Sequence, residues 1–330
     1  MKKYKILYQF PGAFEEYRFE KLHNVTVDSS STGSLAVADE IAALIRDKQA
    51  KGLPCVLGLA TGSSPISVYN QLIKLHKEEG LSFKNVITFN LDEYYGLEPN
   101  DINSYHFFMH ENLFDHIDVP AENINIPSGI IEQSQVRDYC KGYEKKIDDL
   151  GGLDFQLLGI GRTGHVGFNE PGSNINSQTR LVTLDHLTRY DAAGAFYGIE
   201  NVPSKAITMG IKTILSAKRI VLLAWGINKS EIIQKAVEGD LTPNIPTTYL
   251  QKHDNTTSQD CPPPTAPLHP HRHLKNRFCT RCCRSKVFVR RGRNQSLSIH
   301  PNHSFNGLWV PSWVMTTAAK KLSQRGEAQE

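Results

Sequence analysis

A histidine and a glutamate stand five residues apart directly after an apolar stretch of the chain. The stretch 155–160 (FQLLGI) runs into a glycine-rich turn that presents His165 and then Glu170. A short apolar run bounded by glycines predicts a buried strand, and open α/β sheets place their ligand sites at the carboxyl ends of strands. An imidazole exchanges protons near neutral pH, and a carboxylate orients it. The pair predicts an acid–base site, although a tight turn around a core histidine would show the same local pattern.

The glycines of this turn also match the dinucleotide-binding pattern G-x-G-x-x-G, at Gly159, Gly161 and Gly164. That pattern requires the glycines to open a helix. Gly167 and Pro171 would interrupt any helix that began here. We therefore favour an acid–base site over a nucleotide site.

A second strand end carries small polar residues. The apolar run 54–60 is followed by a short loop and then by helical periodicity over 66–79. Free N–H groups, hydroxyls and the positive end of a helix dipole suit a phosphate group, while a simple capped turn is the alternative. The residues of this predicted phosphate loop are Thr61, Gly62, Ser63 and Ser64.

Two further strand ends carry charge. Asp92 and Glu93 follow the apolar run 85–91, where a catalytic base is common and where a capping or surface pair is the alternative. Lys229 follows the run 219–225, where it would contact a phosphate or lie on the surface at a helix start.

Strands and helices alternate along the chain, which predicts an α/β fold with three layers: a mostly parallel, Rossmann-like sheet with helices on both faces. Ser34 is the expected N-cap of a first helix that reaches residue 51. Residues 186–204 show weak periodicity, which favours a mobile segment over the site. The remaining elements are a strand or irregular lead-in near 25–28, helices at 104–116, 133–150 and 226–238, and strands at 179–184 and 206–210.

Composition bounds the class of protein. The 330 residues are 39% hydrophobic and 22% charged, and no run of eighteen apolar residues occurs, so we expect a soluble protein without a membrane span. The start lacks the apolar core of a signal peptide, which predicts a cytoplasmic protein. Residues 258–330 carry 12 Lys and Arg against 3 Asp and Glu, a net of +9, so the rest of the chain carries −6.

This charge break near residue 257 predicts three parts: a lead-in over 1–30, an α/β domain over 31–257, and a basic Cys-, His- and Pro-rich tail over 258–330. Cys279 and Cys282 with nearby histidines would suit zinc, and the arginine-rich run near 290–293 would suit nucleic acid. A disordered or aberrant tail is the interpretation we favour, with neither metal nor nucleic acid bound.

Four stretches together resemble the glucosamine-6-phosphate deaminase family. They are LGLATGSSP (57–65), ITFNLDEYYGL (87–97), LGIGRTGHVGFNEPGS (158–173) and LAWGINKSEIIQKAVEG (223–239), within a likeness that covers roughly residues 35–257. Related sugar-phosphate lactonases share the fold but typically carry Asp-Glu-Arg where this chain has Asp92-Glu93-Tyr94, and they lack the Phe-Asn-Glu-Pro found at 168–171. A lactonase and a non-catalytic sugar-phosphate sensor are the alternatives to a deaminase.

The resemblance implies a role for each predicted site residue. Asp92 would move a proton between C2 and C1 of the open-chain amino sugar, and His165, oriented by Glu170, would assist ring opening. The loop 61–64 and Lys229 would hold the phosphate. No cofactor is implied, and the partner is the small-molecule substrate, with a homo-oligomer as a further expectation.

Departures from the family pattern are also visible. Arg162 and Thr163 replace the usual Asn-Asp before Gly-His, and the phosphate-binding arginine expected near 192–196 has no match. Ser173 and Arg180 resemble part of an allosteric site, but Val182 replaces its lysine. Beyond Thr257 the family continues with an apolar strand and a helix, whereas this chain becomes polar and basic. A shifted reading frame would explain that change, and we expect the missing strand to leave a sheet edge exposed.

Overall fold

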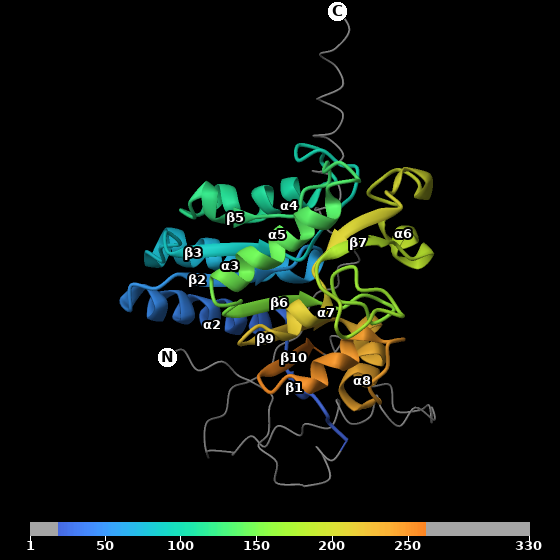
Figure 1. Cartoon of the computed structure of the whole chain (residues 1–330). Helices are drawn as coiled ribbons and strands as arrows, with labels where there is room; N and C mark the ends of the chain where they lie inside the picture. The colour runs from blue at the N-terminus through green and yellow to red at the C-terminus, as the bar shows by residue number, and fades with distance from the viewer. Residues whose placement is uncertain (1–18, 262–330) are drawn as a thin grey trace, which may run out of the picture. The chain divides into compact units, whose positions relative to one another are not determined.

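The computed structural model describes residues 19–261, and Figure 1 shows their arrangement. Within this part, seven strands form one sheet in the order β1-β10-β9-β6-β2-β3-β5, and every neighbouring pair is parallel. The predicted α/β fold with a mostly parallel sheet is confirmed. The strands are β1 (His23–Thr26), β2 (Cys55–Leu59), β3 (Val86–Asn90), β5 (Ile124–Asn125), β6 (Phe155–Gly159), β9 (Ile220–Trp225) and β10 (Thr256–Cys261).

Helices cover both faces of this sheet because side chains alternate along its strands. Leu57 packs with helices α2, α3 and α4 in one core, whereas its neighbour Val56 packs with α5, α7 and α8 in the other. Both faces of each central strand are therefore buried, as a continuous apolar run predicts. The helices are α2 (Ser30–Ala50), α3 (Ser63–Glu79), α4 (Tyr105–Asn112), α5 (Val136–Asp149), α7 (Ile211–Leu215) and α8 (Ser230–Glu238).

A small antiparallel sheet lies beyond the carboxyl end of β3. It has the order β4-β8-β7, with β4 (Asp92–Tyr94), β8 (Lys205–Thr208) and β7 (Arg180–Thr183). Figure 1 shows β7 with the short helix α6 (His186–Ala192) at the right, at one end of the large sheet. Since β4 begins two residues after β3 ends, Asp92 stands at the junction of the two sheets.

The first long helix begins earlier than the apolar periodicity indicates. Ser29 is its N-cap, and its hydroxyl accepts a hydrogen bond from the Thr32 N–H at 3.1 Å. Ser34, the predicted cap, is fully buried inside the helix, so that prediction is wrong. The reason is tertiary packing: a Cβ on Gly33 would lie only 2.6 Å from the Trp225 ring, so this extra turn fits closely against the sheet. The segment 186–204 contains helix α6, and its mobility stays a prediction.

The strand expected to be missing is present. β10 runs across the predicted boundary at 257, pairing with β1 on one side and β9 on the other, so the expectation of an exposed edge beside β9 is wrong. Its sequence, TTSQDC, is polar, and Ser258 is fully buried within it. Hydrogen bonding to strands on both sides thus forms β10, although its sequence has no apolar periodicity. The division into three parts stays a prediction, and the cysteines and histidines at 269–283 lie outside the described residues.

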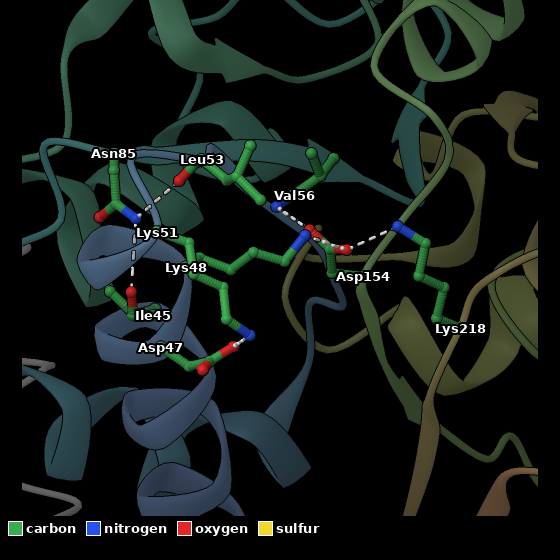
Figure 2. A network of polar contacts seen from close by, with 9 residues as sticks. All are labelled: Ile45, Asp47, Lys48, Lys51, Leu53, Val56, Asn85, Asp154 and Lys218. Carbon is green, nitrogen blue, oxygen red and sulfur yellow. Dashed lines mark hydrogen bonds and ion pairs between the residues drawn. The ribbon is translucent and has the colours of Figure 1, made fainter.

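A buried aspartate ties the amino edge of the large sheet together (Figure 2). Asp154 accepts hydrogen bonds from the Val56 N–H at 3.0 Å, from Lys48 Nζ at 2.7 Å and from Lys218 Nζ at 2.8 Å. Burial would raise the pKa of this carboxyl, but the two ammonium groups and the N–H lower it below its usual value. One side chain thereby joins α2, β2 and the turn before β9.

Across the described range 19–261, no helix has the length and apolar character needed to cross a bilayer.

Candidate active site

A cavity of about 220 Å³ opens where β2, β3, β6 and β9 end. Each of these strands is followed by one of the predicted polar groups, and the cavity brings the groups together although they are far apart in the sequence. The predicted site residues that line it are Thr61, Gly62, Ser63, Ser64, Asp92, His165 and Lys229. Such convergence at strand ends is where open α/β sheets place their ligands.

One wall of the cavity is the start of helix α3. Gly62, the residue before the helix, has a φ of 95°, a left-handed conformation that favours glycine, and no side chain caps the first N–H groups of α3. The Trp225 indole N–H holds the loop by donating to the Ser64 carbonyl at 3.1 Å. Uncapped N–H groups and the positive end of the helix dipole suit an anionic ligand here.

Lys229 brings a positive charge to the same cavity. Its Nζ donates to the Ile160 carbonyl at 2.8 Å, which fixes the ammonium beside the end of β6. Burial lowers the pKa of Lys229, the charge of Arg162 lowers it further, and Asp191 opposes both. An anion bound in the cavity would favour the charged form of this lysine.

Asp92 supplies a carboxyl group that is nearly sealed from water. The residue is 5% exposed, and burial, with a smaller contribution from the charge of Glu93, raises its pKa to about 8. Gly167 makes room for it, because a Cβ there would lie 3.0 Å from both Asp92 Oδ2 and Thr208 Oγ1. A buried carboxyl with a raised pKa is a strong base once it is deprotonated, which suits proton abstraction from carbon.

His165 also lines the cavity, and two oxygen atoms lie close to its Nδ1. The Thr163 hydroxyl lies 2.9 Å away in hydrogen-bonding geometry, and Glu170 Oε2 lies 3.2 Å away as an ion-pair contact. Burial would raise the pKa of Glu170, but His165, with Thr188 and the Asp185 N–H, lowers it overall. Since an ionised carboxylate only accepts, this arrangement favours a proton on Nδ1 and leaves Nε2 for a substrate.

Glu93 does not line the cavity. Its carboxylate accepts the N–H groups of Tyr94 at 2.8 Å, Tyr105 at 3.0 Å and His106 at 2.9 Å, and so it anchors the first turn of α4. Burial outweighs these bonds and raises the pKa of Glu93 to about 7. The capping role, which was one of the two readings of this acidic pair, describes Glu93, and the catalytic reading suits Asp92.

Ser173 and Arg180 lie together but outside the cavity. Arg180 donates to the Ser173 hydroxyl at 3.3 Å and to Asn169 Oδ1 at 3.0 Å. Asn169 in turn donates to the Val166 carbonyl at 2.9 Å, inside the turn that carries His165. The pair is therefore connected through Asn169 to the turn that carries His165, while its regulatory role stays a prediction.

Tyr105 and Phe168 also line the cavity, and sequence reasoning missed both. Tyr105 lies in an aromatic-rich helix, where an aromatic side chain more often belongs to the core. The only signal available was its place in that helix, which follows the acidic pair, and this does not reveal the direction of a side chain.

The model of the family described as glucosamine-6-phosphate isomerases/6-phosphogluconolactonase matches residues 28–258. The chain belongs to this family. A glucosamine-6-phosphate deaminase of Thermoanaerobacter sp. is 49% identical over 217 residues, which are 66% of this chain and 85% of the relative. The glucosamine-6-phosphate deaminase 1 of Bacillus subtilis is 48% identical over 219 residues, 66% of this chain and 90% of the relative.

A third family member, a glucosamine-6-phosphate deaminase-like protein of Bacteroides thetaiotaomicron, is 48% identical over 251 residues, which span 75% of this chain but 38% of that protein. Among solved structures, a monomeric glucosamine-6-phosphate deaminase superposes with a TM-score of 0.69 at 44% identity, covering 73% of this chain and 97% of the other. A 6-phosphogluconolactonase from Trypanosoma cruzi, at 18% identity and a TM-score of 0.58, shares the fold.

Proposed function

We propose that the chain isomerises and deaminates glucosamine 6-phosphate, giving fructose 6-phosphate and ammonia in amino-sugar catabolism. The observation that carries the proposal is that a buried carboxyl, an imidazole with a carboxylate at its Nδ1 and the uncapped start of a helix all line or adjoin one cavity. Family members that are 48–49% identical and are named deaminases support it.

Binding of the phosphate group comes first. The N–H groups at the start of α3, the hydroxyls of Ser63 and Ser64, and Lys229 form an anion-binding wall of the cavity. With the phosphate held there, the sugar ring extends toward Asp92 and His165.

Ring opening needs a proton at the ring oxygen and the loss of one from the C1 hydroxyl. His165 Nε2 is the group for this exchange, because Nδ1 is engaged by Thr163 and Glu170. The product is the open-chain aldehyde with its amine at C2.

Isomerisation then uses Asp92 as the base. Its carboxylate takes the proton from C2 while the aldehyde oxygen O1 accepts a proton from water, which gives an enolamine with a hydroxyl at C1. The carboxyl then returns its proton to C1, which leaves a hydroxymethyl group at C1 and an iminium at C2. Water adds to the iminium, and ammonia leaves as the C2 ketone forms. Every step is a proton transfer, an addition of water, or a C–O or C–N cleavage assisted by these, so the chemistry requires no metal or organic cofactor.

Sugar phosphates are charged intracellular metabolites, so the proposed reaction belongs in the cytoplasm. A homo-oligomer stays a prediction; the solved deaminase that this chain resembles is described as monomeric.

The test is ammonia release from glucosamine 6-phosphate by the full chain and by Asp92→Asn. We expect the variant to lose on the order of 10²–10⁴-fold in kcat, the usual contribution of a general base. Asp47→Asn is the matched control, since Asp47 is an exposed carboxylate paired with Lys51 near the end of α2. Equal rates in wild type and Asp92→Asn would contradict the proposal.

The same preparation separates the alternatives. Calorimetric binding of glucosamine 6-phosphate without any turnover would indicate a sugar-phosphate sensor. Hydrolysis of 6-phosphogluconolactone without ammonia release would indicate a lactonase, and the resemblance to lactonases at 18% identity shows the fold alone.

A further inference from the structure

Arg162 lies beside the cavity without lining it. It directly follows Gly161, a cavity residue, and its Nη2 is 3.0 Å from Asp191 Oδ1. Asp191 belongs to helix α6, and the side chains of Arg162 and Asp191 are 52% and 48% exposed. The guanidinium is therefore held next to the site by a carboxylate that water also reaches.

The charge of Arg162 acts on the lysine of the anion-binding wall. Lys229 Nζ donates to the Ile160 carbonyl, two residues before Arg162, so one short turn positions both cations. The positive charge of Arg162 lowers the pKa of Lys229 by repulsion, and the larger opposing effect of the Asp191 carboxylate offsets it. An anion between them would relieve that repulsion.

The cavity holds too little positive charge for its proposed ligand. Among the described residues that line it, Lys229 is the one lysine or arginine. A phosphate monoester carries about −1.5 to −2 charges at neutral pH, so a single ammonium leaves part of that charge unbalanced. A guanidinium suits the remaining oxygens because its fork of N–H donors binds phosphate in a bidentate manner.

We infer that Arg162 is the second cation for the phosphate group of the substrate, held ready by Asp191 until the phosphate displaces that carboxylate. This inference rests on the proposed function, which supplies the phosphorylated substrate. An exposed ion pair contributes little, so a phosphate group can displace the Asp191 carboxylate from Arg162 at small cost. Arg162 is a positioning residue in this scheme, because it holds the phosphate and takes no part in the proton transfers.

The test measures binding apart from chemistry. In the full chain carrying Asp92→Asn, the Kd of glucosamine 6-phosphate and of inorganic phosphate is measured by calorimetry for Arg162→Ala, Arg162→Lys and Asp191→Asn. Lys51→Ala is the matched control, since Lys51 and Asp47 form a similarly exposed pair, 59% and 54%, at the carboxyl end of α2. Thermal unfolding of each variant checks that the protein remains folded.

We expect Arg162→Ala to weaken both ligands by about ten- to a hundredfold, the usual cost of losing a charge-assisted contact, and Arg162→Lys to recover part of the loss. Asp191→Asn should bind at least as tightly as its parent, because it frees the guanidinium. With Asp92 restored, Arg162→Ala should raise KM far more than it lowers kcat.

Two results would overturn the inference. One is an unchanged Kd in Arg162→Ala. The other is equal weakening by Arg162→Ala and Asp191→Asn, which would mean that the ion pair only fastens α6 to the turn. If the parent protein binds neither ligand, the proposed function itself fails, and this outcome is distinguishable from both.

Discussion

At the scale of single residues, the buried carboxyl of Asp92 sets the expected pH dependence. Burial, and then Glu93, raises its pKa to about 8, and a base acts only when it is deprotonated. We predict that kcat/KM rises about tenfold per pH unit below that value and levels off above it. A pH–rate profile for ammonia release measures this, and a profile already flat from pH 6 would contradict it.

The same shift has a stability consequence with a definite sign. The folded pKa lies above the ordinary 3.8, so between about pH 4 and 8 the native state binds more protons than the unfolded state, and stability falls as pH rises. Asp92→Asn removes this pH-dependent contribution to the free energy of unfolding. Its Tm relative to wild type should therefore increase across that window, and a constant difference would count against the assigned shift.

Residue types at strand ends made much of the site predictable. Asp92, His165 and Lys229 each follow an apolar run, and parallel strands bring such positions to one edge. Tyr105 and Gly167 were not predictable, because a helical aromatic gives no direction and a glycine gives no sign of what packs against it. Glu93 needed the structure as well, since its three N–H partners include two that are more than ten residues away.

At the scale of elements, Glu93 links the strand that carries Asp92, the proposed base, to helix α4. Glu93→Ala removes the acceptor for the N–H groups of Tyr105 and His106 and should destabilise the fold by roughly 1–3 kcal/mol. It should also lower activity, because Tyr105 lines the cavity. Thermal unfolding and ammonia release are compared with Ser104→Ala, which removes the hydroxyl that accepts from the Phe107 N–H and donates to the Pro99 carbonyl. A Glu93→Ala protein no less stable than Ser104→Ala would contradict this.

Element boundaries show where local patterns fail. Apolar periodicity located α3 and the central strands, because their burial is two-sided or follows one helical face. It misplaced the start of α2, where a turn of small polar residues packs against the sheet, and it missed β10, whose polar residues are held by strands on both sides. Tertiary contacts decide both cases, and these contacts come from distant parts of the chain.

At the scale of the whole molecule, the Asp154 network lies at the amino ends of the parallel strands, whereas the proposed active site lies at their carboxyl ends. Asp154 joins α2, β2 and the turn before β9 at the amino edge, and the side chain is 3% exposed. Asp154→Asn should cost about 2–4 kcal/mol, below the full cost of breaking a buried pair because Lys218 is half-exposed. Ammonia release at 25 °C should be unchanged, and Asp47→Asn should cost less than about 0.5 kcal/mol.

Asp154 changes the stability of the fold with pH in the direction opposite to Asp92. The pKa of Asp154 is lowered in the folded protein, so its contribution is present above the ordinary 3.8 and is lost as pH falls through the folded value. Denaturant unfolding at pH 7 and pH 3 measures this contribution. The difference in free energy of unfolding between wild type and Asp154→Asn should be smaller at pH 3 than at pH 7. A gap that widened would overturn this assignment.

The pairing of β1 with β10 also bears on how the chain emerges from the ribosome. His23 is opposite Thr257, so β1 waits for nearly the whole α/β unit to be translated before its neighbour exists. At about 5–20 residues per second, that interval is on the order of 10 to 50 seconds. During it, the nascent chain comes to contain every proposed catalytic and phosphate-binding residue, yet its first strand has no partner. Chaperones would therefore bind a nascent chain that already contains all the proposed site residues but in which β1 and β10 are not yet paired.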